Sequence, residues 1–146
     1  MKTIGAILVL LAFAIAVVPQ YTDCFSQGSV ITLPSGMTMP MKCHWSRQAE
    51  LATAGPLAAV GALMGLSKRK RTIRVLSIVS MVVGLFVILL PATLIGVCAS
   101  EEMICNMIMR PSLILGGVLT ILTSGIALLA SRGPDDEPLV IEGGAA

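Results

Sequence analysis

The fold of this chain is decided by one basic stretch, Ser67-Lys68-Arg69-Lys70-Arg71-Thr72-Ile73-Arg74, which carries five positive charges between two apolar runs. The runs cover residues 49–66 before it and 75–98 after it. A helix needs about 20 apolar residues to cross the hydrocarbon core of a bilayer, so each run predicts a membrane span. Short loops rich in Lys and Arg are typical of the cytoplasmic side. The stretch therefore predicts two membrane helices joined by a cytoplasmic loop at residues 67–74.

The composition of the whole chain indicates a lipid environment. Its 146 residues are 55% hydrophobic and only 12% charged, and the mean hydropathy is +0.92. A soluble domain carries about 25% charged residues, so this chain has too little polar surface to cover itself for water. The net charge of +2 comes without a basic domain in which aromatic residues are interleaved, and nucleic-acid binding therefore has no support.

Two further apolar runs extend the pattern toward both ends of the chain. Residues 112–131 predict a last span and residues 4–20 predict a first one. The first run also fits a cleaved signal peptide, with Lys2 as its basic end and Ala14-x-Ala16 as the cleavage site. We expect a retained span, and the cleaved alternative stays open.

The four spans predict one membrane domain that covers residues 1–146. Short connections make successive helices antiparallel, so the expected fold class is all-α, an integral membrane four-helix up-down bundle. The expected parts are spans at residues 4–20, 49–66, 75–98 and 112–131, outer loops at 21–48 and 99–111, a cytoplasmic loop at 67–74, and a cytoplasmic tail at 132–146.

The positive charges predict the orientation of this bundle. Seven of the ten Lys and Arg residues fall on the predicted inner side and three on the outer side. An excess of Lys and Arg marks cytoplasmic loops, so we expect a multi-pass protein of the cell membrane with both termini in the cytoplasm. The inner group is Lys2, Lys68, Arg69, Lys70, Arg71, Arg74 and Arg132, and the outer group is Lys42, Arg47 and Arg110.

Small side chains recur through the second predicted span. Small residues let helix backbones approach closely in a bilayer, where no hydrophobic force draws helices together. We therefore expect this helix to be buried in the bundle. Its expected packing residues are Ala54, Ala58, Gly61, Ala62 and Gly65.

Ionisable side chains lie only at the ends of the predicted spans. We expect Glu50 at the outer, N-terminal end of the second helix, where the helix dipole favours a carboxylate. Proton relays and ion paths usually need an ionisable group inside the membrane. The pattern therefore argues against a pump or proton-coupled transporter that acts alone.

The four cysteines, Cys24, Cys43, Cys98 and Cys105, all map to the predicted outer loops or their membrane edge. An even number of cysteines on an oxidising face predicts disulfides that stabilise the two extracytoplasmic loops. Pairing within each loop, Cys24 with Cys43 and Cys98 with Cys105, is preferred. A bridge between the loops, such as Cys43 with Cys105, stays open.

Methionines alternate with single residues in both outer loops, and cysteine continues the rhythm. In an extended backbone, alternate side chains point the same way, so each loop could present a row of sulfur atoms. Such donors favour copper in its Cu(I) state, or contact with haem, and an imidazole could join them. Filling of irregular gaps and docking of a partner are the other interpretations. The candidate metal ligands are Met37, Met39, Met41, Cys43, His44, Met103, Cys105, Met107 and Met109.

Two groups of residues resemble a family of small prokaryotic four-span membrane proteins of unknown function. The first group is Met41-Lys42-Cys43-His44-Trp45, followed by Ala49-Glu50 and a Gly/Ala-rich span. The second is Ile95-Gly96-Val97-Cys98, Cys105-Asn106-Met107 and Arg110-Pro111-Ser112-Leu113. The resemblance covers about residues 24–129. It implies a four-span architecture and an association with export-type transporters.

Three functions fit these patterns, and the first of them is favoured. It is a non-enzymatic protein of the lipid bilayer that docks, as an accessory subunit, on a larger transporter-type complex or on another copy of itself. The alternative is the handling of copper or haem at the outer face. A membrane thiol–disulfide enzyme that acts through Cys43 and Cys105 is the least favoured, because there is no Cys-x-x-Cys motif.

Overall fold

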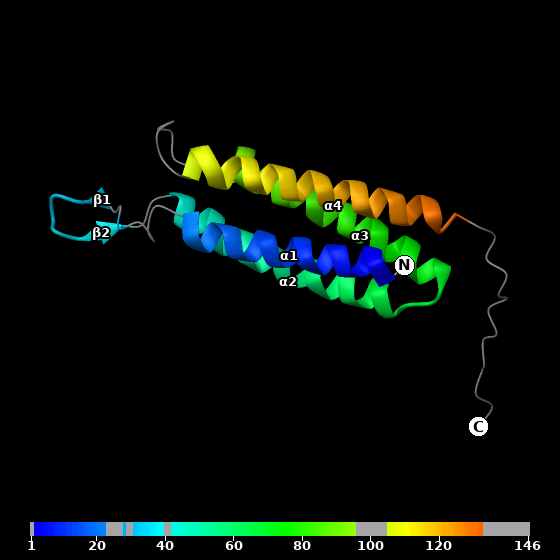
Figure 1. The fold of residues 1–146 in the computed structure, drawn as a ribbon. Coiled ribbons are helices and arrows are strands. Elements are labelled where there is room, and N and C mark those ends of the chain that lie inside the picture. Colours follow the sequence, from blue (N-terminus) through cyan, green and yellow to red (C-terminus); the bar gives the residue numbers. More distant parts are fainter. Residues whose placement is uncertain (1, 23–27, 29–30, 40–41, 96–104, 133–146) are drawn as a thin grey trace, which may run out of the picture.

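A computed structural model describes residues 2–22, 28, 31–39, 42–95 and 105–132. Four long helices run antiparallel to their neighbours along the chain (Figure 1). They are α1 (Lys2–Thr22), α2 (Lys42–Leu66), α3 (Lys70–Leu89) and α4 (Arg110–Ala130). Two short π-helices, η1 (Leu90–Leu94) and η2 (Cys105–Met109), continue α3 and precede α4. The predicted all-α four-helix bundle is confirmed.

Four helical segments in the described part of the chain are long and apolar enough to cross a membrane. They are Lys2–Thr22, His44–Leu66, Lys70–Leu94 and Cys105–Ala130. Large apolar side chains face outward from these helices, among them Leu10, Phe13, Phe86 and Leu122, while Ser77, Ser80, Thr120 and Ser124 are buried. This pattern, apolar outside and polar inside, suits lipid as the surrounding medium. The helices thus indicate a multi-pass membrane protein.

The helices associate in two close pairs, α1 with α2 and α3 with α4. In the first pair, Gly5 lies directly against α2, because a Cβ atom at Gly5 would lie 2.7 Å from the Gly61 carbonyl oxygen and from the Gly65 nitrogen. In the second, a Cβ atom at Gly117 would lie 2.8 Å from the Gly84 carbonyl oxygen. Only glycine permits such short backbone distances, so both pairs depend on small residues.

Most of the small residues of the second span therefore pack against other helices of the same chain. Ala54 and Gly61 are buried, Ala58 and Gly65 are half-buried, and Ala62 is exposed. The α2 helix contributes one face to the bundle and leaves the opposite face to the surroundings.

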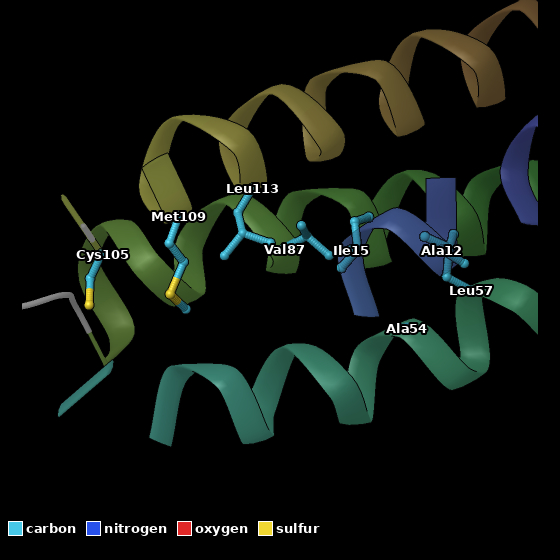
Figure 2. Packing of buried hydrophobic residues seen from close by; sticks show 8 residues of the cluster. All are labelled: Ala12, Ile15, Ala54, Leu57, Val87, Cys105, Met109 and Leu113. Atoms are coloured by element: carbon cyan, nitrogen blue, oxygen red, sulfur yellow. The ribbon is translucent and has the colours of Figure 1, made fainter. Parts of the chain in front are cut away.

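Two clusters of buried apolar residues join the helix pairs. One lies near η2 and draws on all four helices; its members are Ala12, Ile15, Ala54, Leu57, Val87, Cys105, Met109 and Leu113 (Figure 2). The other contains Leu8, Val60, Met64, Ile73 and Ala127. We call the end of the bundle at η1 and η2 the π-helical end, and the end at the connection between α2 and α3 the basic end.

The connection between α1 and α2, which is predicted as an outer loop, contains a two-stranded hairpin. The strands β1 (Ile31–Thr32) and β2 (Thr38–Met39) are antiparallel, with Ile31 opposite Met39 and Thr32 opposite Thr38. The Gly36 N–H donates to the Leu33 carbonyl oxygen at 2.9 Å, and Gly36 has a φ of +80°. That left-handed conformation favours glycine at the end of a turn that Pro34 begins.

Several helix boundaries differ from the predicted spans; α3, for example, begins at Lys70 rather than at residue 75. The α2 helix begins at Lys42 rather than at residue 49, helical structure before α4 begins at Cys105 rather than at 112, and η1 ends at Leu94 rather than at 98. Hydropathy locates the apolar part of a helix, whereas the helical backbone satisfies its own hydrogen bonds and continues through polar residues. Pro111 fits within the first turn of α4, where a helix needs no N–H donor.

The π-helix η1 has a local cause in Pro91. Proline lacks a backbone N–H, and its ring collides with the carbonyl group one turn earlier in an α-helix. The chain widens at this point, and the Ile95 N–H donates to the Leu90 carbonyl oxygen, five residues back, at 3.1 Å. Such π-turns are frequent at functional sites.

Candidate functional site at the π-helical end

Glu50 is an acidic residue buried within a span. Its side chain has no exposed surface, and it lies well inside α2 (Lys42–Leu66). One carboxyl oxygen, Oε1, has no hydrogen-bond partner among the described residues. The other, Oε2, lies 3.5 Å from the Thr53 hydroxyl oxygen, which donates at 2.9 Å to the backbone carbonyl of Glu50. The carboxyl group is thus removed from water with only one long hydrogen bond in return.

This position corrects two predictions. Glu50 is not at the N-terminal end of its helix, because α2 begins eight residues earlier, at Lys42, and the effect of the helix dipole is confined to the first turn. Glu50 also lies within the membrane-spanning segment His44–Leu66. The prediction against a pump or proton-coupled transporter that acts alone depends on spans without internal ionisable groups, and Glu50 removes that support.

The buried face of α2 explains how Glu50 comes to lie inside. Ser46, Glu50 and Ala54 recur every four residues and are all buried, so they share one side of the helix. Ala54 packs in the same cluster as Cys105 and Met109 (Figure 2). The carboxyl group therefore sits one turn from that cluster, on the bundle side of α2. A polar group in such a place is a functional candidate, because an intramembrane ionisable residue is costly to keep.

A signal for this burial exists in the sequence, although the sequence analysis missed it. Among the packing residues, Ala54, Ala58 and Ala62 stand four residues apart, and the same spacing continues backward from Ala54 through Glu50 to Ser46. When this four-residue spacing is extended into the polar residues 42–48, it predicts that Glu50 lies on the face of the helix that is buried in the bundle. Residues 42–48 belong to the predicted outer loop at 21–48, whose glycines, prolines and lack of a helical period favour a loop.

Trp45 and His44 lie beside this site on the first turns of α2. Their rings meet edge to face, with centroids 6.1 Å apart and planes at 80°. Trp45 is 61% exposed and His44 is half-buried. Tyr21, near the end of α1, is also exposed. Exposed Trp and Tyr at a helix end are typical of the boundary between lipid and water, and they place that boundary at the π-helical end.

The described sulfur atoms do not form two extended rows. Residues 105–109 are π-helical, so their side chains do not alternate: Cys105 and Met109 are fully buried, whereas Met107 is 68% exposed. Met37 and Met39 are 63% and 53% exposed on the β1–β2 hairpin. The expectation of an extended backbone in the second loop was wrong.

The remaining candidate ligands leave the metal site a prediction. Met41 and Met103 lie outside the described residues, as does the side chain of Cys43. Within the described part, no group of three or more His, Cys, Asp or Glu side chains is close enough to hold a metal ion.

Of the four cysteines in the predicted disulfide framework, the structure describes the side chain of one, Cys105. Cys105 is fully buried and disulfide-bonded. Cys24, Cys98 and the side chain of Cys43 lie outside the described part. Pairing within the loops and pairing between them both stay predictions.

Comparison with known proteins gives one match. The model of the family described as Domain of unknown function (DUF4418) matches residues 2–130. No curated protein matches the chain, and no solved structure matches it.

Proposed function

This chain belongs to the family of the Domain of unknown function (DUF4418), and because that family carries no assigned function, we propose a role from the geometry of the chain itself. The proposed role is that of a non-enzymatic accessory subunit, which binds a larger, transporter-type membrane protein in the cell membrane. The proposed contact is the β1–β2 hairpin at residues 31–39. The observation that carries this proposal is the exposure of Met37 and Met39 on that hairpin.

The hairpin lies beyond the bundle in the direction of the π-helical end (Figure 1). Tyr21 and Trp45 mark the lipid boundary at that end, so the hairpin belongs in water. A two-stranded hairpin is marginally stable by itself in water. A partner surface that covers one face of the strands would stabilise it, which favours a docking role.

The methionines of the hairpin suit a contact with another protein. Methionine is unbranched and polarisable, and adapts to irregular apolar surfaces. Met37 and Met39 stand two residues apart and are both more than half exposed. No packing role within the bundle accounts for them, in contrast to Met64 and Met109, which are fully buried. The small-residue face of α2 is a weaker docking candidate, because Gly61 and Gly65 already contact Gly5 of α1.

The test compares a hairpin variant, Met37→Ser with Met39→Ser, and a control, Met107→Ser, with the wild type. All three side chains are exposed, so the bundle should fold in every case. Each protein is produced in its native membrane and extracted in a mild detergent, and the mass of its complex is measured. We expect the wild type and the control to run with a heavier partner and the hairpin variant to run without it.

Two results would contradict the proposal. One is the same mass for all three proteins. The other is copper bound by the wild type and lost from the hairpin variant, with no partner in either, which would favour soft-metal handling instead. Metal analysis of the same preparations distinguishes the two.

A further inference from the structure

A groove runs between α1 and α2 at the basic end of the bundle. Its volume is about 580 Å³, and small residues of both helices form its floor. They include Gly5 and Ala6 from α1, and Gly61, Ala62 and Gly65 from α2. The groove exists because glycine and alanine leave the space beside the helix contact unfilled. Ala6 and Ala62 are exposed, so the groove opens away from the bundle, toward the lipid.

Positive charge surrounds the mouth of this groove. Lys2 lines it directly and is exposed. Leu66 lines it at the end of α2, and the exposed residues Lys68 and Arg69 follow within three positions. The N-terminal end of α1 lies beside the connection between α2 and α3 (Figure 1). Arg74 is oriented differently, since its Nε donates to the Ser131 carbonyl oxygen at 2.9 Å. The one acidic residue in the described part of the chain, Glu50, lies toward the other end of α2.

We propose that this groove binds an anionic phospholipid, whose acyl chain lies along the glycine floor and whose phosphate contacts Lys2 and Lys68. Apolar walls within the membrane suit a hydrocarbon chain, and ammonium groups at the mouth suit a phosphate. Clusters of Lys and Arg next to a membrane helix attract anionic lipids, by about 1 kcal/mol for each charge.

Charge decides between a lipid and the other possible occupant, a second copy of this chain. Two copies joined at their α1–α2 grooves would bring the Lys2 and Lys68 groups of both into one region. Like charges across an interface disfavour association, whereas a phosphate at the same place is attracted. The inference concerns the basic end and is independent of the docking role proposed for the hairpin.

The experiment measures phospholipid binding to the full chain in mild detergent by native mass spectrometry. The probes are phosphatidylglycerol, which is anionic, and phosphatidylcholine, which has no net charge. Phosphatidylglycerol should bind the wild type at least 10-fold more tightly. Lys2→Gln with Lys68→Gln should weaken its binding about 5-fold for each lysine removed. The matched control for one lysine, Arg110→Gln, removes a single exposed positive charge at the π-helical end and should change binding less than 2-fold.

A second pair of variants tests the groove itself. Ala62→Phe should fill it, and Ala59→Phe places the same side chain at an exposed position of α2 outside the groove. We expect phosphatidylglycerol binding to be lost in the first and retained in the second, with equal helix content by circular dichroism.

Three results would overturn the proposal. They are equal binding of the two lipids to the wild type, an equal loss of binding from Lys2→Gln and from Arg110→Gln, and a dimer that Ala62→Phe separates in the absence of any lipid preference. The last result would assign the groove to a second copy.

Discussion

The two helix pairs of the bundle are built alike at their contacts but differ in how well their buried polar groups are hydrogen-bonded. Both α1 with α2 and α3 with α4 meet where glycine allows their backbones to touch. In the α3–α4 pair, the buried hydroxyl groups have hydrogen-bond partners. The Ser124 hydroxyl donates to the Ser80 hydroxyl oxygen at 2.7 Å, and the Ser77 hydroxyl donates to the Ile73 carbonyl oxygen at 2.8 Å. The α1–α2 pair instead contains Glu50, with an oxygen atom that has no partner in the described structure.

The α3–α4 pair buries polar groups that are hydrogen-bonded, whereas the α1–α2 pair buries a polar atom that does not contribute to stability. Buried polar groups without partners cost free energy, and proteins keep few of them. The Glu50 carboxyl group, whose Oε1 has no partner in the described part of the chain, and the groove at the basic end both belong to the α1–α2 pair. Among the described residues, the α3–α4 pair thus has hydrogen-bonded buried hydroxyl groups, whereas the α1–α2 pair contains features that stability alone does not require.

The largest expected effect comes from separating the α1–α2 pair at its glycine contact. Gly5→Leu should lower the free energy of unfolding by about 3 kcal/mol, because every close atom is backbone of α2 and cannot move aside. Gly125→Leu in α4 is the control, since nothing lies within 4 Å of its Cβ position. Thermal unfolding in detergent measures both. Equal stability of the two variants would show that the α1–α2 contact is not tight.

The next largest expected effect is a gain in stability, and it sharpens the contrast between the two helix pairs. Glu50→Leu should raise the free energy of unfolding by about 1–2 kcal/mol, because it removes a buried carboxyl group that lacks compensation. The same substitution should not increase the recovery of the heavier complex that is proposed for the wild type. If the carboxyl group belongs to the functional site, that recovery should fall. A loss of stability on Glu50→Leu would instead show that the carboxyl group has a stabilising partner.

The smallest effect is expected in the α3–α4 pair. A double-mutant cycle with Ser80→Ala and Ser124→Ala should give a coupling energy of about 0.6 kcal/mol, the average for hydrogen bonds between membrane helices. Chemical or thermal unfolding of the four proteins in the cycle measures it. A coupling of zero would mean that the 2.7 Å contact adds no stability, and the contrast with Glu50 would then rest on burial alone.

Hydropathy predicted the number and order of the spans but placed the start of the second span at residue 49. The reason lies in residues 42–48, which are too polar to register as membrane segments but form helix in the structure. Glu50 was therefore expected at a helix end. Its place on the buried face follows from the four-residue period that connects it to Ser46 and Ala54.

The alternating sulfur pattern shows the limit of a sequence period more clearly. A spacing of two aligns side chains only in extended backbone. Residues 105–109 are helical, and there the spacing of four between Cys105 and Met109 places both side chains in the core. The same residue pattern is compatible with an extended or a helical backbone, so the pattern alone does not predict which of them forms.

The sequence by itself determined that this chain has four apolar helices suited to a membrane, and the order in which they follow one another. Those properties are local, because each depends on the side chains of one continuous segment. The tertiary structure alone decided which helices pair through glycine, that Glu50 is enclosed, and that a groove stays open beside Gly61. These depend on contacts between residues far apart in the chain, which no single segment specifies.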